Sequence, residues 1–145
     1  MTVDQYELNR FIHAQEDIYG QVISELKNGH KKSHWMWFIF PQIKGLGHSS
    51  SAQKYAIKNL DEATEYLNHP ILGSRLIECC ELLLAINDHS IAEILGYPDD
   101  LKLRSSMTLF AAVKGANPVF KQLLNQYFNG IKDTRTIEIL HAVTA

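Results

Sequence analysis

The stretch Ser33-His34-Trp35-Met36-Trp37-Phe38-Ile39-Phe40-Pro41-Gln42 decides the fold of this chain. This aromatic run holds both tryptophans of the sequence and two of its six phenylalanines. Such large apolar rings must enter a core or line a pocket, because aromatic side chains carry the greatest burial areas. The imidazole of His34 and the two indole N–H groups then need hydrogen-bond partners. The sequence therefore predicts that the core forms around this run and that other segments bring polar groups to it.

The length and charge of the chain limit what kind of protein it is. A chain of 145 residues is long enough for one domain that buries a core without metals or disulfides. The formal net charge is −2, so there is no basic excess to follow a phosphate backbone. We therefore expect a single domain over residues 1–145 and no nucleic-acid partner.

The two cysteines and the lack of a long apolar segment indicate the compartment. Cys79 and Cys80 are adjacent within an apolar helical pattern, which is typical of small core residues in a reducing environment. No signal-peptide pattern opens the chain, and no apolar run approaches the roughly 20 residues that span a bilayer. These features favour a cytoplasmic protein without a membrane partner, and they leave the oligomeric state open.

Caps and helix breakers predict an all-α fold. Capping boxes begin at Thr2 and Ser90, Asn117 and Asp133 are placed as N-caps, and Gly96 can end a helix. Counted from such start and stop signals, the chain forms one compact domain of about eight short helices.

Two segments matter most for the arrangement of these helices. Residues 71–86 give the longest helical pattern, so we expect them to form the central helix. Residues 34–40 have β propensity but no polar alternation, so we interpret them as a short buried segment, as little as one helical turn, that Pro41 ends.

A second informative stretch spans residues 99–110, where polar groups stand among apolar ones. Lys102 faces Ser105 and Ser106 on one side of the predicted helix, because residues three and four apart are neighbours. Half-buried hydroxyls and an amine need partners, and a bound ligand is one candidate. In the simpler alternative, Asp99 and Asp100 only complement the helix N-terminus and Asp100 forms an exposed pair with Arg104.

We predict that the aromatic run and this helix surround one cleft together with Tyr55. His34 is a candidate acid or base, although a core histidine with one satisfied nitrogen is the simpler interpretation. The pair of His30 and His34 lacks the further ligands of a zinc site, and the glycines at residues 45–47 lack the pattern of a phosphate loop. The sequence therefore predicts a small-molecule ligand but no metal or cofactor.

Several motifs together resemble one known family. They are the aromatic run, Gly45-Leu46-Gly47, Tyr55-Ala56-Ile57, His69-Pro70 with Leu72, and Lys102 with Ser105-Ser106-Met107-Thr108-Leu109-Phe110. The chain is similar in these motifs, from about Leu8 to Leu140, to a family of small uncharacterised bacterial proteins that are sometimes labelled calpastatin. The resemblance implies an all-α fold and a cytoplasmic location, and it implies no established reaction.

A more remote similarity points to the NADAR N-glycosidases. Asp100, Arg104 and Met107, followed by residues 117–118 and 123–124, resemble the spacing in those small helical enzymes, which hydrolyse N-glycosidic bonds in ADP-ribose-related or riboflavin-precursor compounds. That family has a glutamate in the helix that would correspond to residues 51–57, and this chain has no acid there.

Two function classes therefore remain open. One is an N-glycosidase-like hydrolase of nucleotide- or ADP-ribose-related small molecules, in which Asp100 and His34 are the candidate catalytic residues. The other is a non-catalytic module that binds a ligand or a protein through the same surface. In the hydrolase class, we expect Lys102 and Arg104 to hold a phosphate and Trp35 or Trp37 to stack on a base or flavin-like ring. The full set of predicted binding residues is Trp35, Trp37, Gln42, Tyr55, Lys102, Arg104, Ser105, Ser106 and Thr108.

Overall fold

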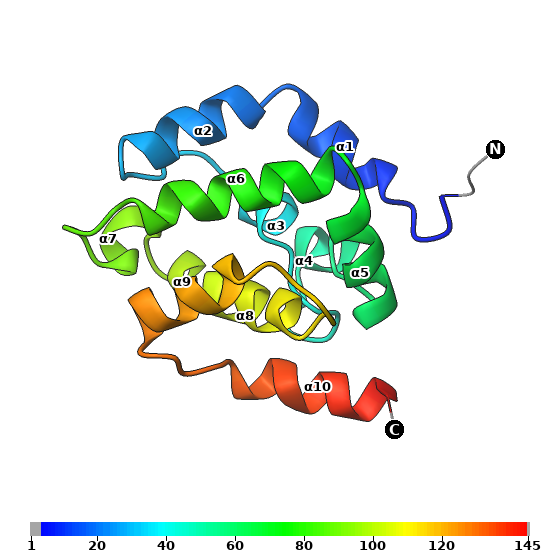
Figure 1. Cartoon of the computed structure of the whole chain (residues 1–145). Helices are drawn as coiled ribbons and strands as arrows, with labels where there is room; N and C mark the ends of the chain where they lie inside the picture. The colour runs from blue at the N-terminus through cyan, green and yellow to red at the C-terminus, as the bar shows by residue number, and fades with distance from the viewer. Residues whose placement is uncertain (1–3, 145) are drawn as a thin grey trace.

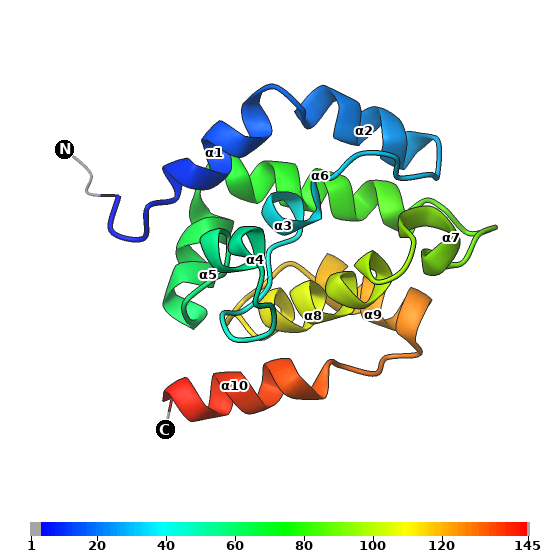
Figure 2. The ribbon, with the colours of Figure 1, turned by 180° about the vertical axis from the view of Figure 1, so that it is seen from behind.

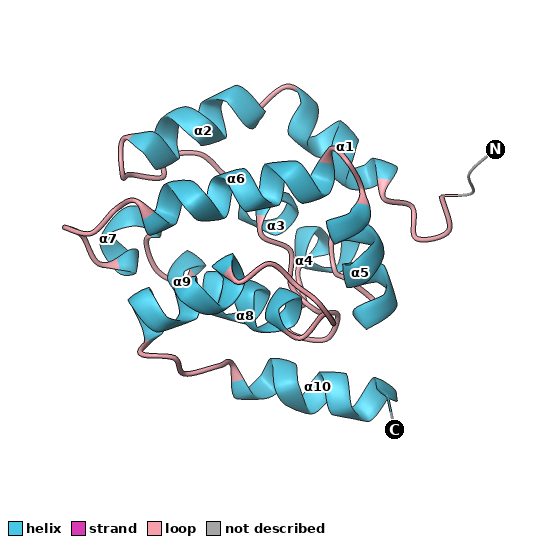
Figure 3. Ribbon diagram, viewed as in Figure 1, coloured by secondary structure: helices cyan, strands magenta, loops and turns pink. Residues whose placement is uncertain are grey.

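The chain folds into ten helices, as seen in a computed structural model that describes residues 4–144 and the side chains of residues 4–142 (Figure 1). They are α1 (Asn9–Glu16), α2 (Tyr19–Lys27), α3 (Met36–Ile39), α4 (Ser50–Lys54), α5 (Leu60–Asn68), α6 (Leu72–Leu84), α7 (Ile91–Leu95), α8 (Asp99–Ala111), α9 (Val119–Phe128) and α10 (Thr134–Thr144). Helices and loops make up the whole described chain, apart from one isolated bridge (Figure 3). The predicted all-α class is confirmed. The count exceeds the expected eight because α3 and α4 are helices of four and five residues, too short to give a full periodic pattern.

The longest predicted helix lies at the centre, as expected. Helix α6 packs against α2 on one side and α9 on the other, and α5 contacts its N-terminal end (Figures 1 and 2). Helix α8 lies beside α9, and α10 covers the outer side of α8. This arrangement places the aromatic run between α1 and the layer of α8 and α9.

Most predicted caps are present where local sequence specifies them. Ser90 and Glu93 form both hydrogen bonds of a capping box, and Gly96 ends α7 at a φ of +83° that favours glycine. Asn117 Oδ1 accepts the N–H of Val119 at 2.9 Å before α9. The capping box predicted from Thr2 begins outside the described residues.

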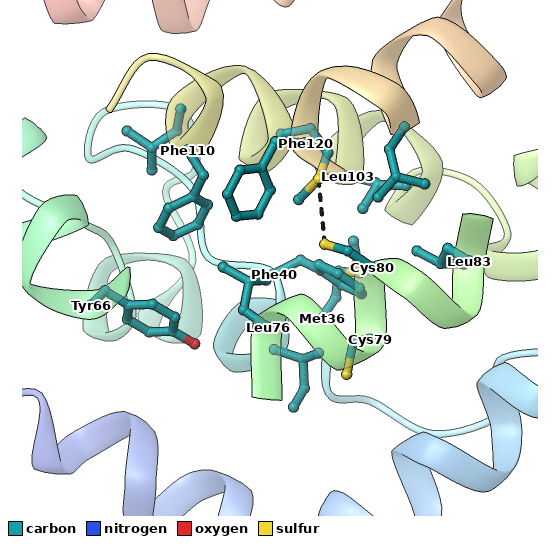
Figure 4. Close-up of a cluster of buried hydrophobic side chains, with 14 of the residues drawn as sticks. Met36, Phe40, Tyr66, Leu76, Cys79, Cys80, Leu83, Leu103, Phe110 and Phe120 are labelled. Carbon is teal, nitrogen blue, oxygen red and sulfur yellow. Dashed lines mark hydrogen bonds between the residues drawn. The ribbon is translucent and has the colours of Figure 1, made fainter. Parts of the chain in front are cut away.

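The aromatic run forms one helical turn and enters the core. Trp35, Met36, Ile39 and Phe40 are buried, and Pro41 follows the end of α3. Figure 4 shows Met36 and Phe40 beside α6, facing the rings that α8 and α9 contribute. The run therefore has the conformation that its length and its proline predict.

The helices of the described chain are too short or too polar to cross a bilayer.

Candidate functional site

A buried carboxylate from α2 holds the start of the aromatic run in place. The side chain of Glu25 is 5% exposed and accepts five hydrogen bonds. Its donors are the backbone N–H of Lys32 at 2.8 Å, the N–H and hydroxyl of Ser33 at 3.1 and 2.7 Å, the indole of Trp35 at 2.9 Å and the amide of Gln21 at 2.9 Å. Glu25 thus provides the partner that the buried Trp35 indole requires.

These hydrogen bonds determine the charge of Glu25. Burial by itself favours the neutral acid and raises the pKa of Glu25. The hydrogen bonds from Lys32, Ser33 and Trp35 favour the carboxylate and outweigh burial, so the pKa of Glu25 falls from 4.5 to about 2. Glu25 is therefore an anion at neutral pH.

Two lysines, two tryptophans and one aspartate form a cluster between the aromatic run and α8. Asp99 Oδ2 lies 2.8 Å from Lys31 Nζ, and Asp99 Oδ1 lies 3.4 Å from Lys102 Nζ. Each lysine also lies over an indole: Lys31 Nζ is 5.0 Å from the ring centroid of Trp35, and Lys102 Nζ is 4.8 Å from that of Trp37. We call these five residues the lysine–tryptophan cluster. It joins the two stretches that the sequence singles out.

The two halves of this cluster differ in their access to solvent. Trp35 is 0% exposed, and the side chain of Lys31 beside it is 7% exposed. Trp37 is only half-buried, and the side chain of Lys102 is 25% exposed. A ligand can therefore reach Trp37 and Lys102, whereas the ring of Trp35 is enclosed by the protein.

The hydroxyls of Ser105 and Thr108 have partners within the protein. Ser105 Oγ donates to Asp133 Oδ2 at 3.1 Å, and Thr108 Oγ1 accepts the backbone N–H of Asp133 at 2.9 Å. Asp133 also caps α10 by accepting the N–H of Thr136 at 3.1 Å. The two hydroxyls thus attach the start of α10 to α8.

Two other polar groups on α8 have no such partner. The hydroxyl of Ser106 and Nε of Arg104 are buried, and neither makes a hydrogen bond within the described part of the chain. The guanidinium of Arg104 lies 6.0 Å from the ring of Phe128, whereas Lys102 lies over Trp37. Because residues two apart point to different sides of a helix, Lys102 and Arg104 do not form one phosphate clamp in this structure.

The two candidate catalytic residues stand at the margins of this site. His34 is exposed at the start of the aromatic run. Asp100 is half-buried, and its Oδ1 accepts the N–H of Leu101 at 2.9 Å. Both remain predictions.

Gln42 and Tyr55 make their contacts with α1, α3 and the segment around Ile57. The carbonyl of Gln42 accepts the N–H of Ile57 at 2.9 Å, beside the isolated parallel bridge of Ile43 and Ile57. The ring of Tyr55 packs against Phe38 and Phe11, with centroid distances of 5.4 and 5.8 Å. Tyr55 thus belongs to a contact between α1, α3 and the end of α4.

Sequence reasoning missed three groups that shape the site: Glu25, Lys31 and Asp99. The spacing of Asp99 and Lys102 was a usable signal, because it allows an i,i+3 ion pair. The sequence predicts that the indole of Trp35 needs a hydrogen-bond acceptor, but no local pattern identifies Glu25 as that acceptor.

No three His, Cys, Asp or Glu side chains among the described residues are placed to hold a metal ion. A cavity of about 880 Å³ lies between α5, α6 and the loop before α9, and it shares no residue with the predicted site.

The fold and this site define a small all-α protein with a charged aromatic cluster between its third and eighth helices. The chain belongs to a family described as a protein of unknown function, DUF1810, whose model matches residues 5–140. It is similar to the crystal structure of the conserved hypothetical protein Rv1873 from Mycobacterium tuberculosis, with 50% sequence identity and a TM-score of 0.94. That similarity covers 95% of this chain and 99% of the other. No curated protein matches the chain.

Proposed function

We propose that this is a cytoplasmic protein that binds a small molecule with a flat ring and an anionic group at Trp37 and Lys102. The observation that supports this most is the position of Lys102 Nζ, 4.8 Å from the ring centroid of the half-buried Trp37. A ring stacked on Trp37 would bring an attached anion to the ammonium group. The two buried free cysteines fit a reducing compartment.

Lys102 is the accessible cation of the lysine–tryptophan cluster. Lys31 and Lys102 share the carboxylate of Asp99, and the anionic Glu25 accepts the indole N–H of Trp35 on the enclosed side. Lys31 makes the shorter contact and is the less exposed, so the accessible charge is that of Lys102. A phosphate or carboxylate of a ligand would balance it.

Ser106 is a further polar group on the Lys102 side of α8. Ser106 lies one turn after Lys102 and is 0% exposed, and its Oγ makes no hydrogen bond with the described residues. A buried hydroxyl without a partner is costly and calls for an explanation. Ser106 is as fully enclosed as Trp35, so a ligand at Trp37 and Lys102 would reach it only after a side chain moved aside.

The resemblance to the NADAR N-glycosidases narrows the chemistry of the ligand. Nucleotide- and ADP-ribose-related compounds combine a flat base with phosphates, which is the pairing that Trp37 and Lys102 would recognise. ADP-ribose is therefore the first compound to test.

Hydrolysis of an N-glycosidic bond is the second candidate function, and it is favoured by the availability of the Asp100 carboxylate. Asp100 is half-buried and makes no ion pair with the described residues, whereas Asp99 is shared by two lysines. As the bond from C1′ to nitrogen breaks, the ribose ring gains positive charge that a carboxylate would stabilise. Water then adds its oxygen to C1′ through Asp100 as base, and the leaving nitrogen takes a proton from His34.

Isothermal titration with ADP-ribose tests the binding function. We expect Lys102→Met to weaken binding by at least about tenfold, because a hydrogen bond to a charged group contributes roughly 1.5–3 kcal/mol. The matched control is Lys121→Met, which removes an exposed lysine on α9 and should leave binding unchanged. Equal affinity of the wild type and Lys102→Met would refute the proposed site.

Release of base or ribose from ADP-ribosyl and ribosylated pyrimidine compounds tests the hydrolase. We expect Asp100→Asn to abolish release while ADP-ribose still binds. Release that is unchanged in Asp100→Asn would exclude this mechanism. Binding without any release would leave the protein as a binding module.

A further inference from the structure

A second place where a ligand could bind is a cavity apart from the lysine–tryptophan cluster. It has a volume of about 880 Å³, opens to solvent, and is lined by α5, α6 from Gly73 to Leu82, the loop over residues 113–117 and the start of α9. This volume is in the range of pockets that bind small molecules. The cavity shares no residue with Trp37 or Lys102, so its function is separate from the one proposed above.

The cavity combines an apolar base with polar walls. Phe120 is fully buried and Val113 is 8% exposed, and both contribute to its lining. Asn68 at the end of α5 and Asn117 before α9 bring two side-chain amides to the same space. Apolar surface with a few polar groups fits a ligand that has apolar side chains and amide bonds.

Charges of both signs line the cavity without neutralising each other. Glu78 and Glu81 lie three residues apart on one face of α6, and Lys114 lies on the opposing loop. Glu78 accepts a hydrogen bond from the hydroxyl of Tyr19. Neither Glu81 nor Lys114 makes an ion pair with the described residues. The cavity thus presents a free carboxylate and a free ammonium group.

The amide of Asn117 is oriented by the helix that follows it. Its Oδ1 accepts the N–H of Val119 at 2.9 Å, so its Nδ2 is left as the donor. This donor lies in the same lining as Lys114, three residues earlier. Together the two groups suit a carboxylate.

We propose that this cavity binds a short zwitterionic peptide with apolar side chains, its ammonium group at Glu81 and its terminal carboxylate at Lys114 and Asn117. The volume exceeds what a single amino acid needs, and the two asparagine amides match peptide bonds of the ligand. The apolar side chains would occupy the base near Phe120.

The dipeptide Leu-Leu and its end-blocked derivatives test this assignment in the intact protein by isothermal titration. We expect Leu-Leu to bind, and we expect N-acetylation or C-amidation of the peptide each to weaken binding at least tenfold. Glu81→Gln should reproduce the effect of N-acetylation, and Lys114→Met that of C-amidation. Lys121→Met and Glu16→Gln, which alter exposed charges outside the cavity, are the matched controls.

A steric variant separates the cavity from its charges. Ser74 is exposed and lines the cavity, so Ser74→Trp should fill its mouth and abolish peptide binding while circular dichroism stays unchanged. Lys102→Met should leave the affinity for Leu-Leu unchanged. A failure of the ADP-ribose site and a failure of the peptide site can therefore be distinguished. Absence of Leu-Leu binding, equal binding of the end-blocked peptides, or full binding by Ser74→Trp would each overturn the assignment.

Discussion

The indole Nε1 of Trp35 donates a hydrogen bond to Oε1 of Glu25 at 2.9 Å, inside the core. This contact connects α2 to the aromatic run and fixes the ring over which Lys31 lies. Trp37, two residues later, consequently points toward α8, where Lys102 lies over its ring. The position of Trp37 in the proposed site thus depends on the carboxylate of Glu25, which is buried and would not itself contact the ligand.

Replacement of Glu25 by Gln should destabilise the protein. The glutamine amide would have the same shape as the carboxylate, but its NH₂ group would replace one of the oxygens that accept hydrogen bonds in the wild type. The donors that face this group would lose their acceptor, and buried donors without acceptors are costly. We expect a loss of about 2–4 kcal/mol in the free energy of unfolding, measured by urea denaturation at pH 7. Glu16→Gln, an exposed change, should cost less than about 0.5 kcal/mol. A similar small cost for Glu25→Gln would show that the carboxylate is not structural.

The same carboxylate should make stability depend on acidity. The pKa of Glu25 is about 2 in the folded protein and 4.5 when unperturbed, so the unfolded chain binds its proton first as pH falls. This contribution is complete above about pH 5 and is lost between about pH 5 and pH 2, to a total of about 3 kcal/mol. Urea denaturation at pH 7, 5 and 3 should show the gap between wild type and Glu25→Gln narrowing as pH falls. A constant gap would contradict the lowered pKa.

The ion pair of Arg10 and Glu62 should be essential for stability. Arg10 Nη2 lies 2.7 Å from Oε2 of the fully buried Glu62, and the guanidinium also donates to the carbonyls of Lys54 and Ala56 at 2.8 Å. Arg10→Met would leave a buried carboxylate without its cation, so we expect a loss of about 3–5 kcal/mol in unfolding free energy. In a double-mutant cycle with Glu62→Met, the double variant should lose much less than the sum of the two. Additive losses would argue against a direct pair.

The two cysteines should be inert in the folded protein. Both are 0% exposed, and burial raises the pKa of Cys79 to about 12 and that of Cys80 well above its usual value. Cys80 Sγ also lies 3.8 Å from Met107 Sδ within the core (Figure 4). Because the thiolate is the reactive form, Ellman's reagent should titrate both thiols in urea and neither in the native protein at pH 8. Rapid reaction of the native protein would mean that the α6 core opens readily.

The helices were predictable because their signals are local. The serine before α7, the asparagine before α9 and the aspartate before α10 act on backbone groups two or three residues away. The single turn of α3 also follows from its own sequence, since Pro41 cannot continue it. Only the number of helices was underestimated.

The contacts that build the site were less predictable because they depend on tertiary packing. Lys31 lies before the aromatic run and Asp99 at the start of α8, and no short pattern connects them. Trp35 and Trp37 have the same chemistry, but residues two apart in a helical turn point to different sides. Sequence alone therefore could not tell which indole is enclosed and which is accessible.

The most direct measurement of the central claim is the pair of indole cross-peaks in an ¹⁵N–¹H spectrum, because the chain has only two tryptophans. Trp37→Phe removes one peak and so assigns both. On addition of ADP-ribose, we expect the Trp37 peak to shift while the Trp35 peak, hydrogen-bonded to Glu25, stays in place. The shift should disappear in Lys102→Met and persist in Lys121→Met. A Trp37 peak that does not move with ADP-ribose, or a shift that survives in Lys102→Met, would contradict a ligand site at Trp37 and Lys102.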